Sequence, residues 1–411
     1  MVSFSSVLLA QASLLQCVLA CGFHGGLYPT ENPLLRRSAV PELPTKKILI
    51  RNVRVFDGHV ILSPRDIVID GSVIGSNPTH PDEVIDGKDG FLIPGLIDSH
   101  THVQQISHME DLSRYGVTTA FNMNCLNFTS CEIFKSQVGL TSIFTAGVPI
   151  IAPNSDHART TPIPKSMLIT DVSQADLYVG WAVTNGSDFM KIVSEGNGPT
   201  QEMQDAAVQA SHSRGIQSST HASWEIPYQQ AIQSKTDNIQ HIFGESLIAK
   251  KWLLRMKAQG QSSVPTLTVM RYASENPAVR EFLRGTAETN QTYPIHRENV
   301  KRLHEAGVPV VAGTDSVGYV EGLFDMPHGL KLHEELDNLV EAGMTEIEAL
   351  RAATSLPAKL RNLSDRGVIA PGRRADLILL NSDPFVNISN TKDISKVWIQ
   401  GIEYPDVAKL S

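Results

Sequence analysis

Two histidines separated by one residue end an apolar, strand-like segment early in the chain. The segment is FLIPGLIDSHTH, residues 91–102. Because alternate side chains of a strand point to the same side, His100 and His102 can direct two imidazoles at one point. Neutral imidazoles are common ligands of zinc and similar ions, so this spacing indicates part of a metal site.

Four more residues with metal-binding or catalytic chemistry lie in or at the ends of short apolar or β-branched runs downstream. They are Lys191 in SDFMKIV, His221 at the end of GIQSSTH, His241 at the end of DNIQH and Asp315 at the end of VPVVAGTD. Taken singly, each has a structural explanation: a lysine extends from a strand end, a histidine bonds within a core, and an aspartate caps a helix. Their joint occurrence in this order favours a shared site.

The segment PGLIDSHTH resembles the first barrel strand of the amidohydrolase superfamily, and the four later residues follow in that superfamily's order. The resemblance implies an α/β fold with a (β/α)8 TIM barrel, in which active sites lie at the carboxyl ends of the strands. The pattern is most similar to the binuclear type, among prolidase-like and imidazolonepropionase-like enzymes. It covers nearly all of the chain from about Lys46 to Tyr404.

In the binuclear type, a carboxylated lysine bridges two divalent metals. The resemblance implies that His100, His102 and Asp315 hold one metal, that His221 and His241 hold the other, and that Lys191 binds both. Lysine shifts its pKa readily when it is buried, and its neutral amine can add CO2 to form an anionic carbamate. The imidazole and oxygen donors suit zinc.

Two metals imply a bridging hydroxide as the nucleophile, because their combined charge lowers the pKa of bound water toward neutrality. Asp315 would accept the hydroxide proton and return it to the leaving group, while one metal polarises the scissile carbonyl. The expected enzyme is a metal-dependent amidohydrolase that cleaves a carbon–nitrogen bond. The favoured small-molecule substrate is an N-acyl amino acid or a dipeptide-like amide.

Three other functions are compatible with parts of this pattern. One-metal deaminases of cyclic amidines typically carry a glutamate three residues after the strand-five histidine. Here Glu225 lies four residues after His221, and Lys191 would have no role, so the hydrolase is favoured. A tailoring hydrolase of small-molecule biosynthesis would keep the same metal site. A non-enzymatic assembly protein is disfavoured because every ligand position is present.

Four residues are candidates for contact with the substrate. His157 falls near the end of the expected third strand, where prolidase-like relatives carry a Gly-Gly-His string, although the two glycines are missing here. Trp224 is expected beyond strand five, and Arg271 and Tyr272 beyond strand seven. Arginine and tyrosine side chains could hold a substrate carboxylate.

Length and charge fit a two-domain protein that binds no nucleic acid. The 411 residues accommodate a barrel of about 250 residues and a smaller module. Strand-like runs flank the barrel on both sides, and the later flank contains PGRRADL, which resembles the family's composite β-sandwich. We therefore expect the sandwich at residues 46–93 and 364–405 and the catalytic barrel at 94–363.

The net charge of −8 argues against a nucleic-acid partner, and the chain is compatible with a homo-oligomer.

The first twenty residues are apolar and dotted with serine, and Val18-Leu19-Ala20 resembles a signal-peptidase site. We expect a signal peptide at residues 1–20 and a secreted protein. No Lys or Arg precedes Arg36, so the alternative is an N-terminal extension of a cytoplasmic protein. Polar interruptions in this segment, and the lack of a later long apolar run, argue against a stable membrane span.

Five Asn-x-Ser/Thr sequons also favour a secreted glycoprotein. They begin at Asn127, Asn185, Asn290, Asn362 and Asn387. Of the four cysteines, Cys17 and Cys21 lie at the N-terminal segment, whereas Cys125 and Cys131 are near enough in sequence to close a short disulfide loop. Two buried free thiols are the equal alternative at that pair.

Overall fold

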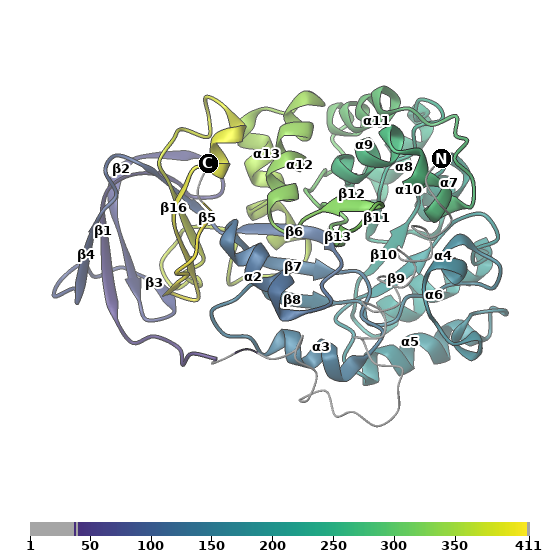
Figure 1. Cartoon of the computed structure of the whole chain (residues 1–411), viewed down its shortest axis with the longest axis horizontal. Coiled ribbons are helices and arrows are strands. Elements are labelled where there is room, and N and C mark those ends of the chain that lie inside the picture. The colour runs from purple at the N-terminus through teal and green to yellow at the C-terminus, as the bar shows by residue number, and fades with distance from the viewer. Residues whose placement is uncertain (1–36, 38–39, 409–411) are drawn as a thin grey trace.

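The computed structural model describes Arg37 and residues 40–408, and strands from both ends of the chain meet in one sheet (Figure 1). The sheet order is β17-β16-β15-β5-β1-β2-β3, with β4 paired to β1. Its early strands are β1 (Lys47–Phe56), β2 (Ile61–Asp70), β3 (Val73–Gly75), β4 (Glu83–Asp86) and β5 (Phe91–Pro94). Its late strands are β15 (Leu377–Leu380), β16 (Ile394–Ile399) and β17 (Ile402–Glu403).

The two flanks of the chain are joined by strand pairing and by a shared core. Strand β5 pairs in parallel with β1 and antiparallel with β15, with Leu92 opposite Leu379. Inward-facing β-branched residues of β1, such as Ile50 and Val55, pack with Leu377 and Trp398 from the late strands. Burial of these side chains removes apolar surface from water, so neither flank has a complete core without the other.

The barrel begins immediately after this sheet, at Gly95. A Cβ at Gly95 would lie 2.3 Å from Thr118 Oγ1, so only glycine permits this close approach of the chain to residue 118, near the start of the second barrel strand. The barrel strands are β6 (Leu96–Thr101), β7 (Val117–Asn122), β8 (Ser142–Thr145), β9 (Met190–Val193), β10 (Ser218–His221), β11 (Asn238–Gln240) and β12 (Ser262–Val264). Neighbouring strands within β6–β8 and within β9–β12 are parallel.

Backbone hydrogen bonds close the two gaps between these sets of strands. Asp188 N donates to Thr145 O at 2.8 Å, which links β8 to the start of β9. The extended segment 308–314 fills the other gap: Val311 N donates to Ser263 O at 2.9 Å on one side. On the other side, Ser99 N donates to Ala312 O at 3.0 Å. The strands therefore form a ring with eight members when residues 308–314 are included.

Helices surround the ring and alternate with its strands (Figure 1). They are α2 (Ile106–Arg114), α3 (Phe128–Lys135), α4 (Asp156–Thr160), α5 (Gln174–Thr184), α6 (Gln201–Ser213), α7 (Glu225–Ser234), α8 (Lys250–Gln259), α9 (Leu267–Glu275), α10 (Pro277–Arg284), α11 (Tyr293–Glu305), α12 (Leu330–Glu341), α13 (Glu346–Ala352) and α14 (Ser355–Leu360). Short η3 (Lys165–Met167) and η4 (Ile388–Lys392) turns and a hairpin of β13 (Gly318–Val320) and β14 (Phe324–Met326) complete the described chain. Local signals set several ends: Thr345 and Glu348 form a capping box on α13, and Gly260 ends α8 in the left-handed region. Among the described residues, no helix has the length and hydropathy needed to cross a bilayer.

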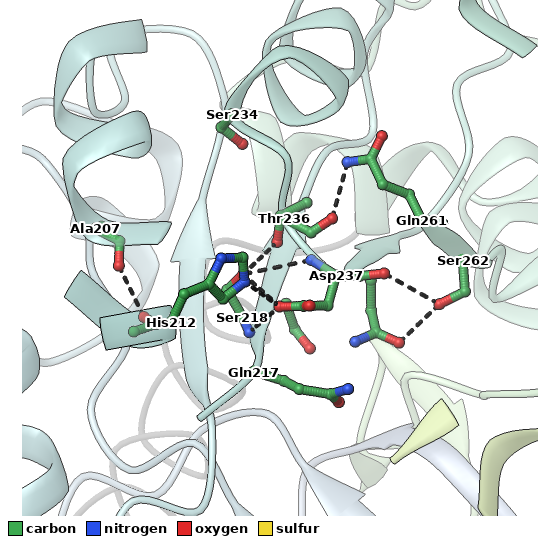
Figure 2. Close-up of polar contacts among 12 residues, drawn as sticks. Ala207, His212, Gln217, Ser218, Ser234, Thr236, Asp237, Gln261 and Ser262 are labelled. Atoms are coloured by element: carbon green, nitrogen blue, oxygen red, sulfur yellow. Dashed lines mark hydrogen bonds and ion pairs between the residues drawn. The ribbon is translucent and has the colours of Figure 1, made fainter. Parts of the chain in front are cut away.

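Polar side chains join the amino-terminal ends of β10, β11 and β12 (Figure 2). Asp237 Oδ2 accepts hydrogen bonds from Ser218 N at 2.8 Å, from Ser218 Oγ at 3.0 Å and from His212 Nε2 at 2.9 Å. Beside it, Gln261 Nε2 donates to Thr236 O at 2.8 Å. We call this set, centred on Asp237, the floor network, because it lies at the strand ends opposite those that carry the candidate site.

Candidate metal centre

The structure brings the six predicted ligand residues together at the carboxyl ends of the barrel strands. His100 lies on β6, Lys191 on β9 and His221 at the end of β10, while His102, His241 and Asp315 directly follow β6, β11 and the segment 308–314. All six line one cavity of about 550 Å³. This is the position expected for a barrel active site, because the loops that follow the strands surround it.

Asp315 is in contact with both histidines of the HxH pair. Its Oδ1 lies 3.0 Å from His100 Nε2 and 2.9 Å from His102 Nε2. These three residues offer ligand atoms that all lie within 4.8 Å of one another. The centres of the imidazole rings of His100 and His241 are 4.8 Å apart, and those of His221 and His241 are 4.4 Å apart. The histidines thus form a continuous cluster rather than separate core residues.

Two of the ligand residues have backbone conformations that are uncommon for residues other than glycine. His241 has φ of 70° and Asp315 has φ of 59°, both in the left-handed region. A residue other than glycine adopts this region at a cost of about 1–3 kcal/mol, and such residues concentrate at functional sites. The strain places both side chains toward the cavity at the points where their strands end.

Hydrogen bonds from the far side of the imidazole rings set their orientation. His100 Nδ1 donates to Gln240 Oε1 at 2.9 Å, and His241 Nδ1 lies 2.8 Å from Thr266 Oγ1. Both rings therefore present Nε2 to the cluster, and metal-binding histidines are commonly held in this way. His100 Nε2 is buried without a hydrogen bond of good geometry, although Asp315 is close. An orphaned imidazole nitrogen beside a carboxylate fits a site for a cation.

Burial controls the charges at the centre. It lowers the pKa of His100 to about 4 and the pKa values of His221 and His241 well below the ordinary value, so these imidazoles are neutral at neutral pH. Burial also lowers the pKa of Lys191 to about 7, against the attraction of Asp315. For Asp315 burial acts in the opposite direction, but His100 and the other histidines outweigh it and hold the pKa of the carboxyl well below its usual range. The cluster therefore contains neutral imidazoles, a carboxylate and an amine that loses its proton easily.

A second group of possible ligands contains a residue that sequence patterns did not reveal. Glu195 follows β9 and accepts hydrogen bonds from His157 N and His157 Nδ1, each at 2.9 Å. The His157 ring packs edge-on against His221 with 4.5 Å between ring centres, and the three residues offer ligand atoms within 4.8 Å. Burial raises the pKa of Glu195, but the hydrogen bonds from His157 outweigh it and lower that pKa overall. Glu195 therefore holds His157 at the edge of the candidate centre.

The structure separates the four predicted substrate contacts into two pairs. His157 and Trp224 line the cavity, whereas Arg271 and Tyr272 are absent from its described lining. Arg271 binds Asn338 and Glu341, each at 3.0 Å, and Tyr272 donates to Leu323 O at 3.2 Å. The cause is helical periodicity on α9, because Val269, Met270 and Ala273 face the cavity and the two residues between them point elsewhere.

A disulfide closes one loop at the cavity rim. Cys125 lines the cavity and is bonded to Cys131, with an S–S distance of 2.09 Å. The sequence had left a disulfide and two free thiols as equal alternatives at this pair. The bond joins Cys125, in the loop after β7, to Cys131 on α3, and the N-cap of that helix, Asn127, lies between them.

Comparison with known proteins decides the family. Residues 169–402 match the Amidohydrolase family. This chain belongs to that family. It is therefore a metal-binding hydrolase that acts on carbon–nitrogen bonds, and the relationship predicted from the sequence is confirmed.

Similar sequences carry different descriptions. An uncharacterised protein of Mycobacterium tuberculosis is 25% identical over 315 residues, which cover 70% of this chain and 78% of the relative. An adenine deaminase of Clostridium perfringens is 23% identical over 379 residues, which cover 83% of this chain and 56% of the deaminase. Family membership therefore leaves the substrate open.

Solved structures agree in fold. A Xaa-Pro dipeptidase with bound methionine has a TM-score of 0.76 at 23% identity, covering 87% of this chain and 99% of that chain. A molinate hydrolase has a TM-score of 0.72 at 19% identity, covering 88% and 95% of the two chains. The ochratoxinase of A. niger also has a TM-score of 0.72, at 17% identity, covering 87% and 96%. The predicted α/β fold, a TIM barrel with a β-sandwich module, is confirmed.

Proposed function

We propose that this amidohydrolase uses two divalent metal ions, most suitably zinc, to hydrolyse an amide of the N-acyl amino acid or dipeptide type. The observation that carries the proposal is Lys191, a buried lysine of strand β9 placed in the same cavity as four histidines and Asp315. A buried amine whose pKa lies near 7 is often unprotonated at neutral pH and can react with CO2. The resulting carbamate would supply the anionic bridge between the two ions.

The residues present fit such a centre. His100, His102 and Asp315 would hold one ion, and His221 and His241 would hold the other, with carboxylated Lys191 between them. Neutral imidazoles and oxygen anions form a donor set that zinc accepts. When bound, such ions supply an activated water molecule and polarise a carbonyl group.

The chain's own groups would manage the protons and the substrate. Asp315 is ionised because its pKa is held low, so it can accept a proton from the attacking water and deliver it to the leaving nitrogen. Glu195 binds Nδ1 of His157 and leaves Nε2 of that ring available to the substrate. Trp224 and apolar residues such as Met270 and Phe324 line the remainder of the cavity and would exclude water.

One contact argues against the deaminase alternative. Glu225, the only glutamate close after His221 in sequence, accepts from Gln229 Nε2 at 3.0 Å and from Ser246 Oγ at 2.6 Å. It is not among the described residues that line the cavity. The proton-shuttling glutamate of a one-metal deaminase therefore has no counterpart at this position.

Metal content and product analysis test the proposal together. Protein isolated without chelators, or loaded with zinc in bicarbonate, should contain close to two metal ions per chain and should cleave members of a panel of N-acyl amino acids and dipeptides. No bound metal after loading would overturn the proposal. One metal per chain together with release of ammonia from adenine-like substrates would establish the deaminase instead.

We also propose that the protein is secreted and glycosylated. The predicted signal peptide lies outside the described residues, so the support comes from elsewhere. The disulfide between Cys125 and Cys131 suits an oxidising compartment. Four sequon asparagines are exposed, namely Asn185, Asn290, Asn362 and Asn387. Amino-terminal sequencing of protein recovered from the medium should begin after Ala20, and enzymatic deglycosylation should lower its mass; retention of Met1 inside the cell would contradict secretion.

A further inference from the structure

An arginine that the proposed catalytic centre does not use lies on the wall of the cavity. Arg284 is the last residue of α10, which packs beside α4, the helix that carries His157. Its guanidinium carbon lies 4.3 Å from the centre of the Trp224 ring. Trp224 follows the predicted ligand His221 by three residues, so the stacked pair borders the metal centre.

The charge of Arg284 has no close anionic partner in the described part of the chain. No carboxylate there lies within the 4.0 Å that defines an ion pair. Its two side-chain hydrogen bonds, to Thr289 Oγ1 and Gln291 Oε1, are both at the 3.5 Å limit. Arg284 is half-buried, and Asp156 and Glu245 attract it from beyond ion-pair distance, so an anionic ligand would supply the direct charged partner that it lacks.

The neighbouring charged groups already have other partners. Asp156 forms an ion pair with Arg159 at 3.7 Å, and Glu245 accepts a hydrogen bond from Glu225 N at 2.9 Å. Arg280, on the same helix, donates to three backbone carbonyls, with distances of 2.7 to 2.9 Å. Arg280 thus has a structural role that explains it, whereas Arg284 has weak contacts and faces the cavity.

We propose that Arg284, stacked on Trp224, binds a carboxylate of the substrate and makes the enzyme selective for amides that carry a free carboxylate. The guanidinium offers paired N–H donors that match the two carboxylate oxygens. Phe282, Leu283 and Met270 lie on the same cavity lining and would hold an apolar group of the same molecule. The inference rests on the proposed amide hydrolysis, and it assigns to Arg284 the role that the sequence suggested for Arg271.

The test compares two ligands of similar shape that the enzyme cannot hydrolyse: 3-phenylpropionate and the uncharged ketone 4-phenylbutan-2-one. Binding of each to the zinc-loaded full-length protein is measured by calorimetry. We expect the carboxylate to bind about 10–100-fold more tightly, the range for a charge-assisted hydrogen-bonded contact. In Arg284→Met the preference should fall by at least about tenfold, the part that a charge-assisted contact supplies, with ketone binding unchanged.

Two further variants sharpen the result. Arg255→Met is the matched control, because Arg255 also lies over a tryptophan, Trp252 at 5.8 Å, but is exposed on helix α8 and does not line the cavity. It should keep the full carboxylate preference. Arg284→Lys retains the charge without the paired donors, so it should keep part of the preference. Thermal melting of each variant verifies that it is folded.

The outcomes separate this inference from the proposed function. If Arg284→Met is folded and still prefers the carboxylate as strongly as the unaltered protein, the subsite is overturned, whether or not amides are hydrolysed. If the preference is lost but no amide of the panel is hydrolysed, the subsite stands and the proposed reaction fails. Equal weakening of both ligands in Arg284→Met would assign Arg284 to cavity shape alone and would also overturn the inference.

Discussion

The two ends of the same barrel strands use similar residues in opposite ways. At the floor, Asp237 Oδ2 accepts from a backbone N–H, a hydroxyl and the His212 imidazole, all within 3.0 Å. At the mouth, Asp315 Oδ1 lies between two imidazoles, and His100 Nε2 is left without a proper hydrogen bond. A carboxylate with complete protein partners stabilises the fold, while one in an incomplete cluster remains available to a cation.

Left-handed backbone occurs at both ends, but largely on different residue types. At the floor, positive φ falls on glycines such as Gly116 and Gly215 and on Lys235, whereas at the mouth it falls on His241, Thr266 and Asp315. Such strain persists only where the surrounding structure enforces it. The strained positions at the mouth therefore include two of the proposed metal ligands. Substitutions at the two ends should therefore have separable effects on activity and on stability.

Lys191→Ala should have the largest effect on activity. Removing the bridging group should cost both metal ions and essentially all turnover, because the cations would then lack the anion between them. Metal analysis and an amide-hydrolysis assay measure the two losses in parallel, with exposed Lys257→Ala as the control. Acetate or propionate should partly restore both properties. A Lys191→Arg variant that kept both metals and normal activity would refute the bridge, since a guanidinium stays protonated.

Asp315→Asn should reduce kcat by about 10²–10⁴-fold, the usual contribution of general acid–base catalysis. The amide keeps nearly the same shape but can neither accept the proton from water nor return it to the leaving nitrogen. Circular dichroism should show an unchanged fold. Near-normal turnover in the folded variant would mean that another group moves the proton.

Gln240→Leu should have a smaller effect, expressed first in metal affinity. Loss of the acceptor for His100 Nδ1–H frees the ring to rotate, and loss of such an orienting partner typically weakens metal binding by about 10–100-fold. Competition with a chelator measures the zinc affinity. Gln240→Glu restores an acceptor and should recover most of that affinity; if both variants bind zinc normally, Gln240 does not position His100.

Asp237→Ala should have the smallest effect on catalysis and should act on stability. It removes the acceptor from the buried Ser218 N–H and hydroxyl, which costs about 1–3 kcal/mol when buried donors lose their partner. Urea unfolding should report this loss, while kcat per folded molecule stays within about twofold by the independence of distant sites. A large fall in kcat without loss of stability would show that the two ends are coupled.

Much of the candidate site could be predicted because strands impose simple geometry. The side chains of His100 and His102 share a face of an alternating strand, and Lys191, His221, His241 and Asp315 lie at or near strand ends. Their order along the chain matched that of the superfamily which the sequence resembles, and this resemblance grouped them. The β-sandwich flanks were visible in the same way, from alternation and turn residues.

The remaining parts of the site depend on contacts that local patterns do not encode. Glu195, in the loop after β9, meets His157 on α4, and Arg284 reaches Trp224 from a helix that follows a different strand. Arg271 was placed at the substrate because its strand ends nearby, but the rotation of α9 turns it toward Glu341. The pairing of Cys125 with Cys131 stayed open because sequence spacing permits a bond without requiring it.

The pairing of β5 with β15 has a consequence for biosynthesis. Phe91 lies opposite Leu380. Strand β5 is therefore synthesised early, but it can pair with β15 only near the end of translation. All the barrel strands emerge in that interval, and domains tend to fold as they appear. Until the late strands are synthesised, the apolar face of β1 and β5 stays exposed to solvent. We therefore expect chaperones to bind the nascent chain. Premature termination before Leu377 would thus leave an aggregation-prone chain with an exposed apolar sheet face, even though every proposed metal ligand had already been synthesised.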